Sequence, residues 1–167
     1  MCIRDRDIIV DFENLSKLKF EMEIKKTEFL RKYESEIEGV SIDIYVPYYS
    51  KFPIPIEEIL KNIVEIESFK VPKPEVLLIL KQQAEMERKD SVKGQKDRVD
   101  ILCLAKSGKI DWKNYKNLLE RFKLEEYEKR LKEIVSSAKI EFEYLGIINL
   151  REMKKLKEKI LKEIRSN

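Results

Sequence analysis

The sequence of 167 residues predicts an α+β fold in which strands and helices come first and a helical region follows. Apolar and polar residues alternate over 40–46 (VSIDIYV), which is the two-residue period of a half-buried strand. From Lys96 onward, apolar residues recur at helical spacing, with breaks only near Gly108 and Gly146. Strands therefore do not alternate regularly with helices, as they would in a wound parallel sheet.

The first segment is expected to form a strand and then a long helix. Residues 8–10 are apolar and indicate a short buried strand. The following helix is expected to be capped by Asn14 or Ser16 and to continue to Ile37, because apolar residues recur at spacings of three, four and seven. Alternation over 18–24 leaves a strand as the alternative for that stretch.

Prolines mark the boundaries in the middle of the chain. Pro47 ends the strand over 40–46, Pro72 ends a later strand, and Pro74 suits the first turn of a helix. The elements expected after Pro47 are a helix over 56–61, a strand over 63–71, a helix over 75–88, a polar loop over 89–96, and helices over 97–106, 111–122, 124–138 and 149–165.

The composition excludes several kinds of catalytic site. The absence of histidine excludes a Ser-His-Asp triad, a Cys-His dyad and an imidazole proton shuttle. Cys2 and Cys103 are too few for a disulfide framework and fit the reducing cytoplasm, where we expect the protein to lie. No apolar run approaches the roughly 20 residues that cross a bilayer, so no membrane segment is expected. Carboxylates, lysines and arginines remain, and these suit Mg²⁺-dependent phosphoryl or nucleotidyl chemistry.

The first six residues, MCIRDR, resemble a translated sequencing adaptor. The alternative is an ordinary charged N-terminus. We expect residues 1–6 to be an artefact, set aside from the fold, and the natural N-terminus to be missing. The expected organisation is then a truncated domain of strands and helix over 7–72 and a helical region over 73–167.

Two aspartates form the first candidate site. Asp43 lies within the strand over 40–46 and points away from Ile42 and Ile44, and Asp7 opens another strand. Carboxylates that face the same way on neighbouring strands can share a Mg²⁺ ion. The alternative is that Asp43 lies on the solvated face of an antiparallel sheet.

Charged residues on two helices form the second candidate site. Lys81, Ala84 and Arg88 share one helical stripe, and Asp97 and Asp100 share another. Lysine and arginine side chains that project from one helix can bind triphosphate oxygens. The alternative is a solvated face with ordinary ion pairs, the default in a sequence with 40% charged residues.

Three segments together resemble the nucleotidyltransferase superfamily, in particular the minimal nucleotidyltransferases and the nucleotidyltransferase toxins of abortive-infection systems. Residues 71–102 are similar to its helical motif, in which a Lys-x-x-Ala helix with a trailing Arg precedes a Lys/Arg-Asp-x-x-Asp segment. Residues 41–60 resemble the strand with the third catalytic carboxylate, and residues 7–12 resemble the strand with the Asp-x-Asp metal pair. The resemblance covers about residues 7–105 and implies a partial nucleotidyltransferase-type mixed sheet with flanking helices.

The activity implied by this resemblance is transfer of a nucleotidyl group from ATP or another NTP to an acceptor, with Mg²⁺ as the cofactor. The implied acceptors are tRNA, a protein or a small molecule, and a cognate antitoxin is an implied partner. Asp43 would be the catalytic base or a metal ligand, and Asp7 the second metal-binding carboxylate. The other implied residues are Lys81, Arg88 and Lys96, which would hold the nucleotide, and Asp97 and Asp100, which would orient those cations.

The chain departs from the family pattern at its start. The Gly-Ser loop that grips the nucleotide should lie upstream of Asp7, where the chain has only residues 1–6. The first carboxylate of the metal pair would fall at Asp5, inside the adaptor-like segment, and we take this match as accidental. We therefore expect activity of the family type to be absent or much reduced.

Two other functions remain open from the sequence. One is a non-catalytic module that binds a partner, as in toxin–antitoxin pairs, through the helices over 111–122 and 124–138. The other is an RNA-binding module that uses the lysine-rich segment 150–165. Glu152, Glu158 and Glu163 interleave with those lysines, which favours a solvated face for that segment.

Overall fold

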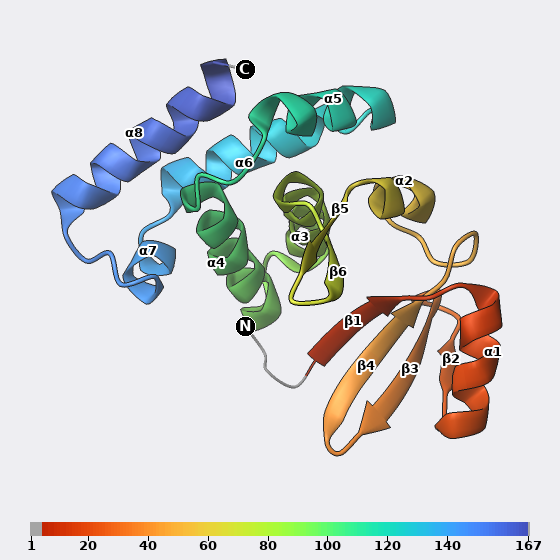
Figure 1. Ribbon diagram of the computed structural model, residues 1–167. Helices are drawn as coiled ribbons and strands as arrows, with labels where there is room; N and C mark the ends of the chain where they lie inside the picture. Colours follow the sequence, from red (N-terminus) through yellow and green to blue (C-terminus); the bar gives the residue numbers. More distant parts are fainter. Residues whose placement is uncertain (1–4, 167) are drawn as a thin grey trace. The chain divides into compact units, whose positions relative to one another are not determined.

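The computed structural model describes residues 5–166 and confirms the α+β class, with helices, one mixed sheet and one hairpin (Figure 1). The chain forms two compact units, the first ending at Lys61 and the second beginning at Asn62. Cys2 and the adaptor-like residues 1–4 lie outside the described residues. No helix within the described range is long and apolar enough to cross a membrane.

The first unit contains a four-stranded mixed sheet and two helices. The strand order is β1-β4-β3-β2, in which β1 runs parallel to β4 and the other neighbours are antiparallel (Figure 1). Its elements are β1 (Asp5–Ile9), α1 (Phe12–Glu21), β2 (Lys25–Thr27), β3 (Lys32–Ile37), β4 (Val40–Tyr45) and α2 (Ile56–Lys61).

One face of this sheet carries the core of the first unit. Leu15 of α1 is buried together with Tyr33 of β3 and with Ile44 and Val46 of the β4 segment. The Asp11 side chain accepts a hydrogen bond from the Asn14 amide and begins α1, because that amide has no partner within the helix. The cap therefore lies earlier than the predicted Asn14 or Ser16.

The second unit begins with a hairpin and continues as a helical bundle. The α3 and α4 helices pack against each other, and α6 contacts α3, α4, α5 and α8. Buried residues such as Ile101, Leu131 and Ile134 form the interior of this bundle. Its elements are β5 (Ile63–Ile66), β6 (Phe69–Pro72), α3 (Pro74–Arg88), α4 (Val92–Lys106), α5 (Trp112–Phe122), α6 (Glu125–Ser137), α7 (Ile140–Tyr144) and α8 (Leu150–Ser166).

The predicted helix up to Ile37 is wrong beyond Glu21. Residues 25–37 form the antiparallel pair β2–β3 instead, and the alternative strand over 18–24 is also wrong because α1 continues to Glu21. Phe29 supported the helical period, but its side chain is 96% exposed in the turn between the two strands. Pairing with β4 therefore outweighed the local apolar spacing.

Three further differences concern boundaries in the second unit. The predicted strand over 63–71 is a hairpin, turned by Glu67 and Ser68, which both have positive φ. Most of the predicted loop over 89–96 is helical, because the Ser91 hydroxyl caps α4 by accepting a hydrogen bond from the Gly94 amide. The short helix α7 was not predicted.

Candidate functional site

The sheet of the first unit places Asp7 beside Asp43. Asp7 of β1 is the register partner of Asp43 on the adjacent parallel strand β4. Paired residues on neighbouring strands project from the same face, and successive residues project from opposite faces. Because Ile44 lies in the core beside α1, both aspartates project from the face opposite α1.

Lys32 is the closest charged neighbour of Asp43. Its ammonium nitrogen lies 2.6 Å from Asp43 Oδ2 and 2.9 Å from Glu34 Oε1, and its side chain is only 13% exposed. Burial alone would lower the pKa of Lys32, but the hydrogen bonds to Asp43 and Glu34 outweigh burial and raise it. Lys32 therefore stays charged and neutralises part of the negative charge beside Asp43. Sequence reasoning missed this residue, since its contact depends on the register of β3 with β4.

Asp7 is more open to solvent than Asp43. The Tyr45 hydroxyl, two positions beyond Asp43 on β4, donates to Asp7 Oδ1 at 3.4 Å. The Asp7 residue is exposed, whereas the Asp43 side chain retains 30% of its exposure. A solute can therefore reach Asp7 directly, while Asp43 is bounded on one side by Lys32.

Asp7 and Asp43 are two described residues of this sheet that could contribute oxygen ligands to a metal ion. Mg²⁺ is often bound by one or two carboxylates, with substrate phosphates and waters completing an octahedron. Asp7 and Asp43 provide two such oxygen donors on one face. Across residues 5–166, no three acidic or cysteine side chains gather closely enough to hold a metal on their own. Asp7 and Asp43 thus offer two carboxylates, and any metal bound there would need its remaining ligands from elsewhere.

The second unit brings the other predicted residues together between α3 and α4. The Arg88 guanidinium donates through Nε and Nη2 to the two oxygens of Asp97, at 2.7 and 3.0 Å. The Lys81 ammonium lies 2.7 Å from Asp100 Oδ2 and 3.9 Å from Asp97 Oδ1. The Asp97 side chain is only 4% exposed and contacts both cations on their buried side. The side chains of Lys81 and Arg88 remain 32% and 43% exposed, so a solute can reach them.

Gly94 makes this close pairing of helices possible. A Cβ atom at this position would lie 2.2 Å from the backbone oxygen of Arg88 and 2.8 Å from Cα of Lys89. Only glycine therefore fits where α4 begins against the end of α3. The Ser91 hydroxyl also donates to the carbonyl of Arg88, three residues earlier, which closes the corner between the two helices.

Lys96 is the predicted nucleotide-binding residue that the structure leaves outside this cluster. It lies one helical turn before Asp100 on α4 and is exposed. Its ammonium group makes no hydrogen bond or ion pair with the described part of the chain. Lys96 can contribute positive potential to the same end of α4, but nothing in the structure orients it.

A buried charge network in the second unit was not predicted. Glu85 is fully buried and accepts a hydrogen bond from Arg130 Nε at 2.9 Å. Arg98 lies 4.0 Å from Glu85 and donates to Glu141 at 2.6 Å. Burial raises the pKa of Glu141, but backbone hydrogen bonds and Arg98 outweigh burial and hold that pKa below its ordinary value. This network joins helices that are distant in sequence, so no local spacing marks it.

Comparison with known proteins gives no match: no protein family, no curated protein and no solved structure matches the chain significantly.

Proposed function

We propose that the protein is nucleotidyltransferase-like: it binds an NTP with Mg²⁺ and transfers the nucleotidyl group to a hydroxyl acceptor. The observation that carries the proposal is the side-by-side placement of Asp7 and Asp43 on parallel strands. The resemblance of residues 7–105 to that superfamily adds to it. Within the second unit, Lys81 and Arg88, oriented by Asp97 and Asp100, form a separate cationic cluster that suits phosphate oxygens.

The proposed reaction needs a charged carboxylate beside the acceptor. Asp43 accepts the proton of the acceptor hydroxyl, whose oxygen attacks the α-phosphorus as the bond to pyrophosphate breaks. When bound, Mg²⁺ supplies positive charge for the triphosphate and the leaving pyrophosphate. The Lys32 ammonium lies 2.6 Å from Asp43 Oδ2 and leaves Oδ1 for the acceptor. Asp7 holds a second negative oxygen donor at the same face.

Lys81 and Arg88 contribute differently to phosphate binding. Arg88 already donates two N–H groups to Asp97, so the plane of its guanidinium group is fixed before a ligand binds. Lys81 is a point charge held mainly by Asp100, and a phosphate can replace that carboxylate as its partner. We therefore assign the main loss of NTP affinity in this cluster to removal of Lys81.

Mg²⁺-dependent NTP binding tests the proposal directly. Binding is the readout because residues 7–167 contain no Gly-Ser pair and little transfer is expected. Fluorescent ATP and GTP analogues are titrated with and without Mg²⁺. Asp43→Asn should weaken binding about tenfold when Mg²⁺ is present and hardly at all in EDTA, because it removes one charged metal ligand.

Matched variants separate the site from general charge effects. Glu36→Gln removes an exposed carboxylate from β3, and Lys113→Ala removes an exposed lysine from α5; both should leave binding unchanged. Lys81→Ala should weaken binding with or without Mg²⁺. Circular dichroism of each variant checks the fold. The proposal is wrong if NTP binding does not depend on Mg²⁺, or if Asp43→Asn and Lys81→Ala bind as well as the parent protein.

A further inference from the structure

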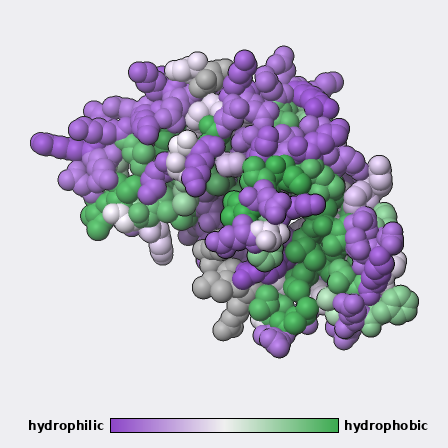
Figure 2. Space-filling view, in the orientation of Figure 1, coloured by the Kyte–Doolittle hydropathy of each residue, from purple (hydrophilic) through white to green (hydrophobic). Residues whose placement is uncertain are grey.

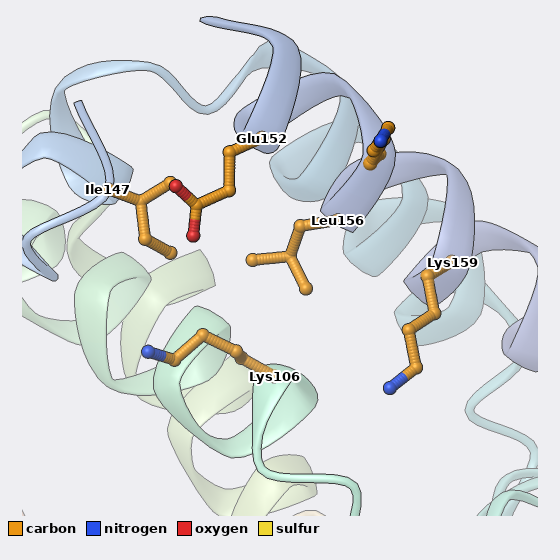
Figure 3. Close-up of a pocket in the computed structure, with 6 residues that line it drawn as sticks. Lys106, Ile147, Glu152, Leu156 and Lys159 are labelled. Carbon is orange, nitrogen blue, oxygen red and sulfur yellow. The ribbon is translucent and has the colours of Figure 1, made fainter. Parts of the chain in front are cut away.

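A second cationic surface lies in the helical unit and uses none of the residues assigned to the nucleotide. A hollow of about 330 Å³ is bounded by the end of α4, the segment before α8 and the first turns of α8 (Figure 3). It is lined by Lys106, Ile147, Glu152, Lys155, Leu156 and Lys159. None of these residues belongs to the clusters around Asp43 or Asp97.

The charges that line this hollow are unbalanced. Three lysines line it with a single acidic residue, Glu152. Within residues 5–166, the side chains of Lys106, Lys155 and Glu152 have no hydrogen bond or ion pair, and Lys159 has only a long contact of 3.8 Å to Glu163. The three lysines are exposed, whereas the half-buried Arg98 and Arg130 of the same unit are paired with carboxylates. The hollow therefore concentrates positive charge that the protein does not neutralise.

Apolar residues lie between the lysines of this hollow. Ile147 is only 6% exposed and Leu156 is half-buried. In Figure 3, the side chains of Lys106 and Lys159 lie on opposite sides of Leu156. An anion held between them would contact apolar surface on one side, where water screens charge less effectively than in bulk solvent.

The solvent face of α8 extends the same positive potential. At 100° per residue, Arg151, Lys155, Lys159 and Lys162 project in similar directions, opposite the buried Met153 and Ile160. Glu163 instead turns toward the Trp112 indole, which donates to it at 3.3 Å. Glu163 is thus held at the margin of the basic face, whereas Glu152 lines the hollow and Glu158 projects beside Arg151, so the basic residues outnumber the acidic ones on this face without excluding them. The surface of α8 is hydrophilic in Figure 2.

We propose that this hollow binds a phosphate group, held by the ammonium groups of Lys106, Lys155 and Lys159. Three point charges without a planar fork suit the divalent, tetrahedral charge of a phosphate better than a planar carboxylate. The phosphate belongs either to a free nucleotide or to a nucleic-acid backbone, whose neighbouring phosphates would follow Arg151 and Lys162 along α8. The site goes beyond the proposed function, because it uses none of the residues assigned there.

The test compares charge reversals inside and outside the hollow. Inorganic phosphate, ATP and a single-stranded RNA are titrated onto the whole protein, with amide NMR shifts as the readout. Lys106→Glu with Lys155→Glu should raise the Kd of the bound probe at least about tenfold, from loss of two charge-assisted contacts. Lys113→Glu with Lys129→Glu changes the net charge equally at exposed positions on α5 and α6 and should change Kd less than about twofold.

The probes distinguish the two sources of the phosphate. A backbone site predicts that RNA binds more tightly than ATP, and that log Kd changes with log salt with a slope of about 2 for three neutralised phosphates. A site for a free ligand predicts that ATP or phosphate shifts the amides of Lys106 and Lys155 while RNA binds no better. The proposal is overturned if no probe shifts these amides at millimolar concentration, or if both double variants lose the same affinity.

Discussion

At the scale of single residues, Lys32 determines the electrostatics around Asp43. Its ammonium group joins two carboxylates from adjacent strands, and it is the least exposed member of that cluster. The sequence predicted the aspartate from the strand pattern, but the lysine gave no such signal. Lysines are so frequent in this chain that only the register of β3 identifies Lys32.

Replacing Lys32 should move the titration of its neighbour Glu34. The hydrogen bond from Lys32 is the main cause that lowers the pKa of Glu34, followed by one from Thr27. Lys32→Met should therefore raise the Glu34 pKa toward its ordinary value. In the parent protein, this pair stabilises the folded state above the ordinary Glu34 pKa, and the contribution is lost as the pH falls through the lowered pKa. The variant should lack both the contribution and its loss at acidic pH. Carboxyl-carbon NMR titration measures the shift. Lys17→Met, which removes an exposed α1 pair with Glu13, serves as the control.

Tyr127 should make the fold sensitive to alkaline pH. Burial, with the nearby charges of Glu126 and Glu87, raises the Tyr127 pKa from 10.0 to about 12. The folded state thus holds the phenol proton more tightly than the unfolded chain, so stability should fall as pH rises from 10 to 12. Tyr127→Phe should reduce this slope in urea unfolding curves, whereas Tyr144→Phe, at an 80% exposed position, should not. An unchanged slope for Tyr127→Phe would remove Tyr127 as its cause.

At the scale of elements, the α3–α4 corner depends on one glycine. The sequence predicted the Lys81–Arg88 stripe and the Asp97–Asp100 stripe from spacing, and it predicted α3 within one residue. It did not predict that α4 begins at Val92, because glycine and several charged residues usually indicate a loop. The close approach of the two helix backbones is a tertiary contact that local sequence does not predict. The sequence shows only the glycine that this contact requires.

Gly94→Ala should open this corner. The new methyl group would meet backbone atoms of Arg88 and Lys89, which cannot move aside as a side chain would. We expect a loss of about 1–3 kcal/mol in the free energy of unfolding, and weaker pairing of Arg88 with Asp97. Chemical denaturation measures the loss. Gln95→Ala, at the adjacent exposed position, should be nearly neutral, and equal stability of the two variants would contradict the proposed clash.

The β5–β6 hairpin stores strain in its turn. Glu67 and Ser68 adopt φ of 48° and 70°, in the left-handed region that disfavours residues with a Cβ atom. Ser68→Gly should therefore stabilise the protein by roughly 1 kcal/mol, which corresponds to about 2–4 °C in Tm for a chain of this length. Calorimetry tests this, with Lys70→Gly in β6 as the control that should destabilise. A lower Tm for Ser68→Gly would contradict the turn assignment.

At the scale of the whole molecule, the two units differ in how far local sequence determines them. The helices α2, α3, α5, α6 and α8 follow spacing, caps and prolines, and their boundaries agree with the sequence prediction to within one or two residues. The sheet of the first unit depends on pairing between segments that are far apart in sequence, and there the prediction of 25–37 is wrong. The partnership of Asp7 with Asp43 is of this second kind, since only the β1–β4 register creates it.

The second unit should fold without the first. Its helices contact one another and bury Ile101, Leu131 and Ile134, and Glu85 finds both of its cationic partners within the unit. A segment of residues 62–167 should therefore show a helical circular dichroism spectrum and one cooperative thermal transition. A gradual loss of signal on heating would contradict this expectation. Glu85→Ala in the same segment should be strongly destabilising, because two arginines would lose a buried partner.

Strand β1 forms one edge of the four-stranded sheet, and among residues 5–166 it pairs with β4 alone. The amide and carbonyl groups on its other side could form hydrogen bonds with a strand from another molecule. Such edge-to-edge pairing is the usual start of sheet-mediated aggregation. If two such edges met antiparallel about their centre, the two Asp7 carboxylates would be forced together, and like charges repel. We therefore expect Asp7 to oppose self-association through this edge, and its neutralisation should lower the solubility of the chain.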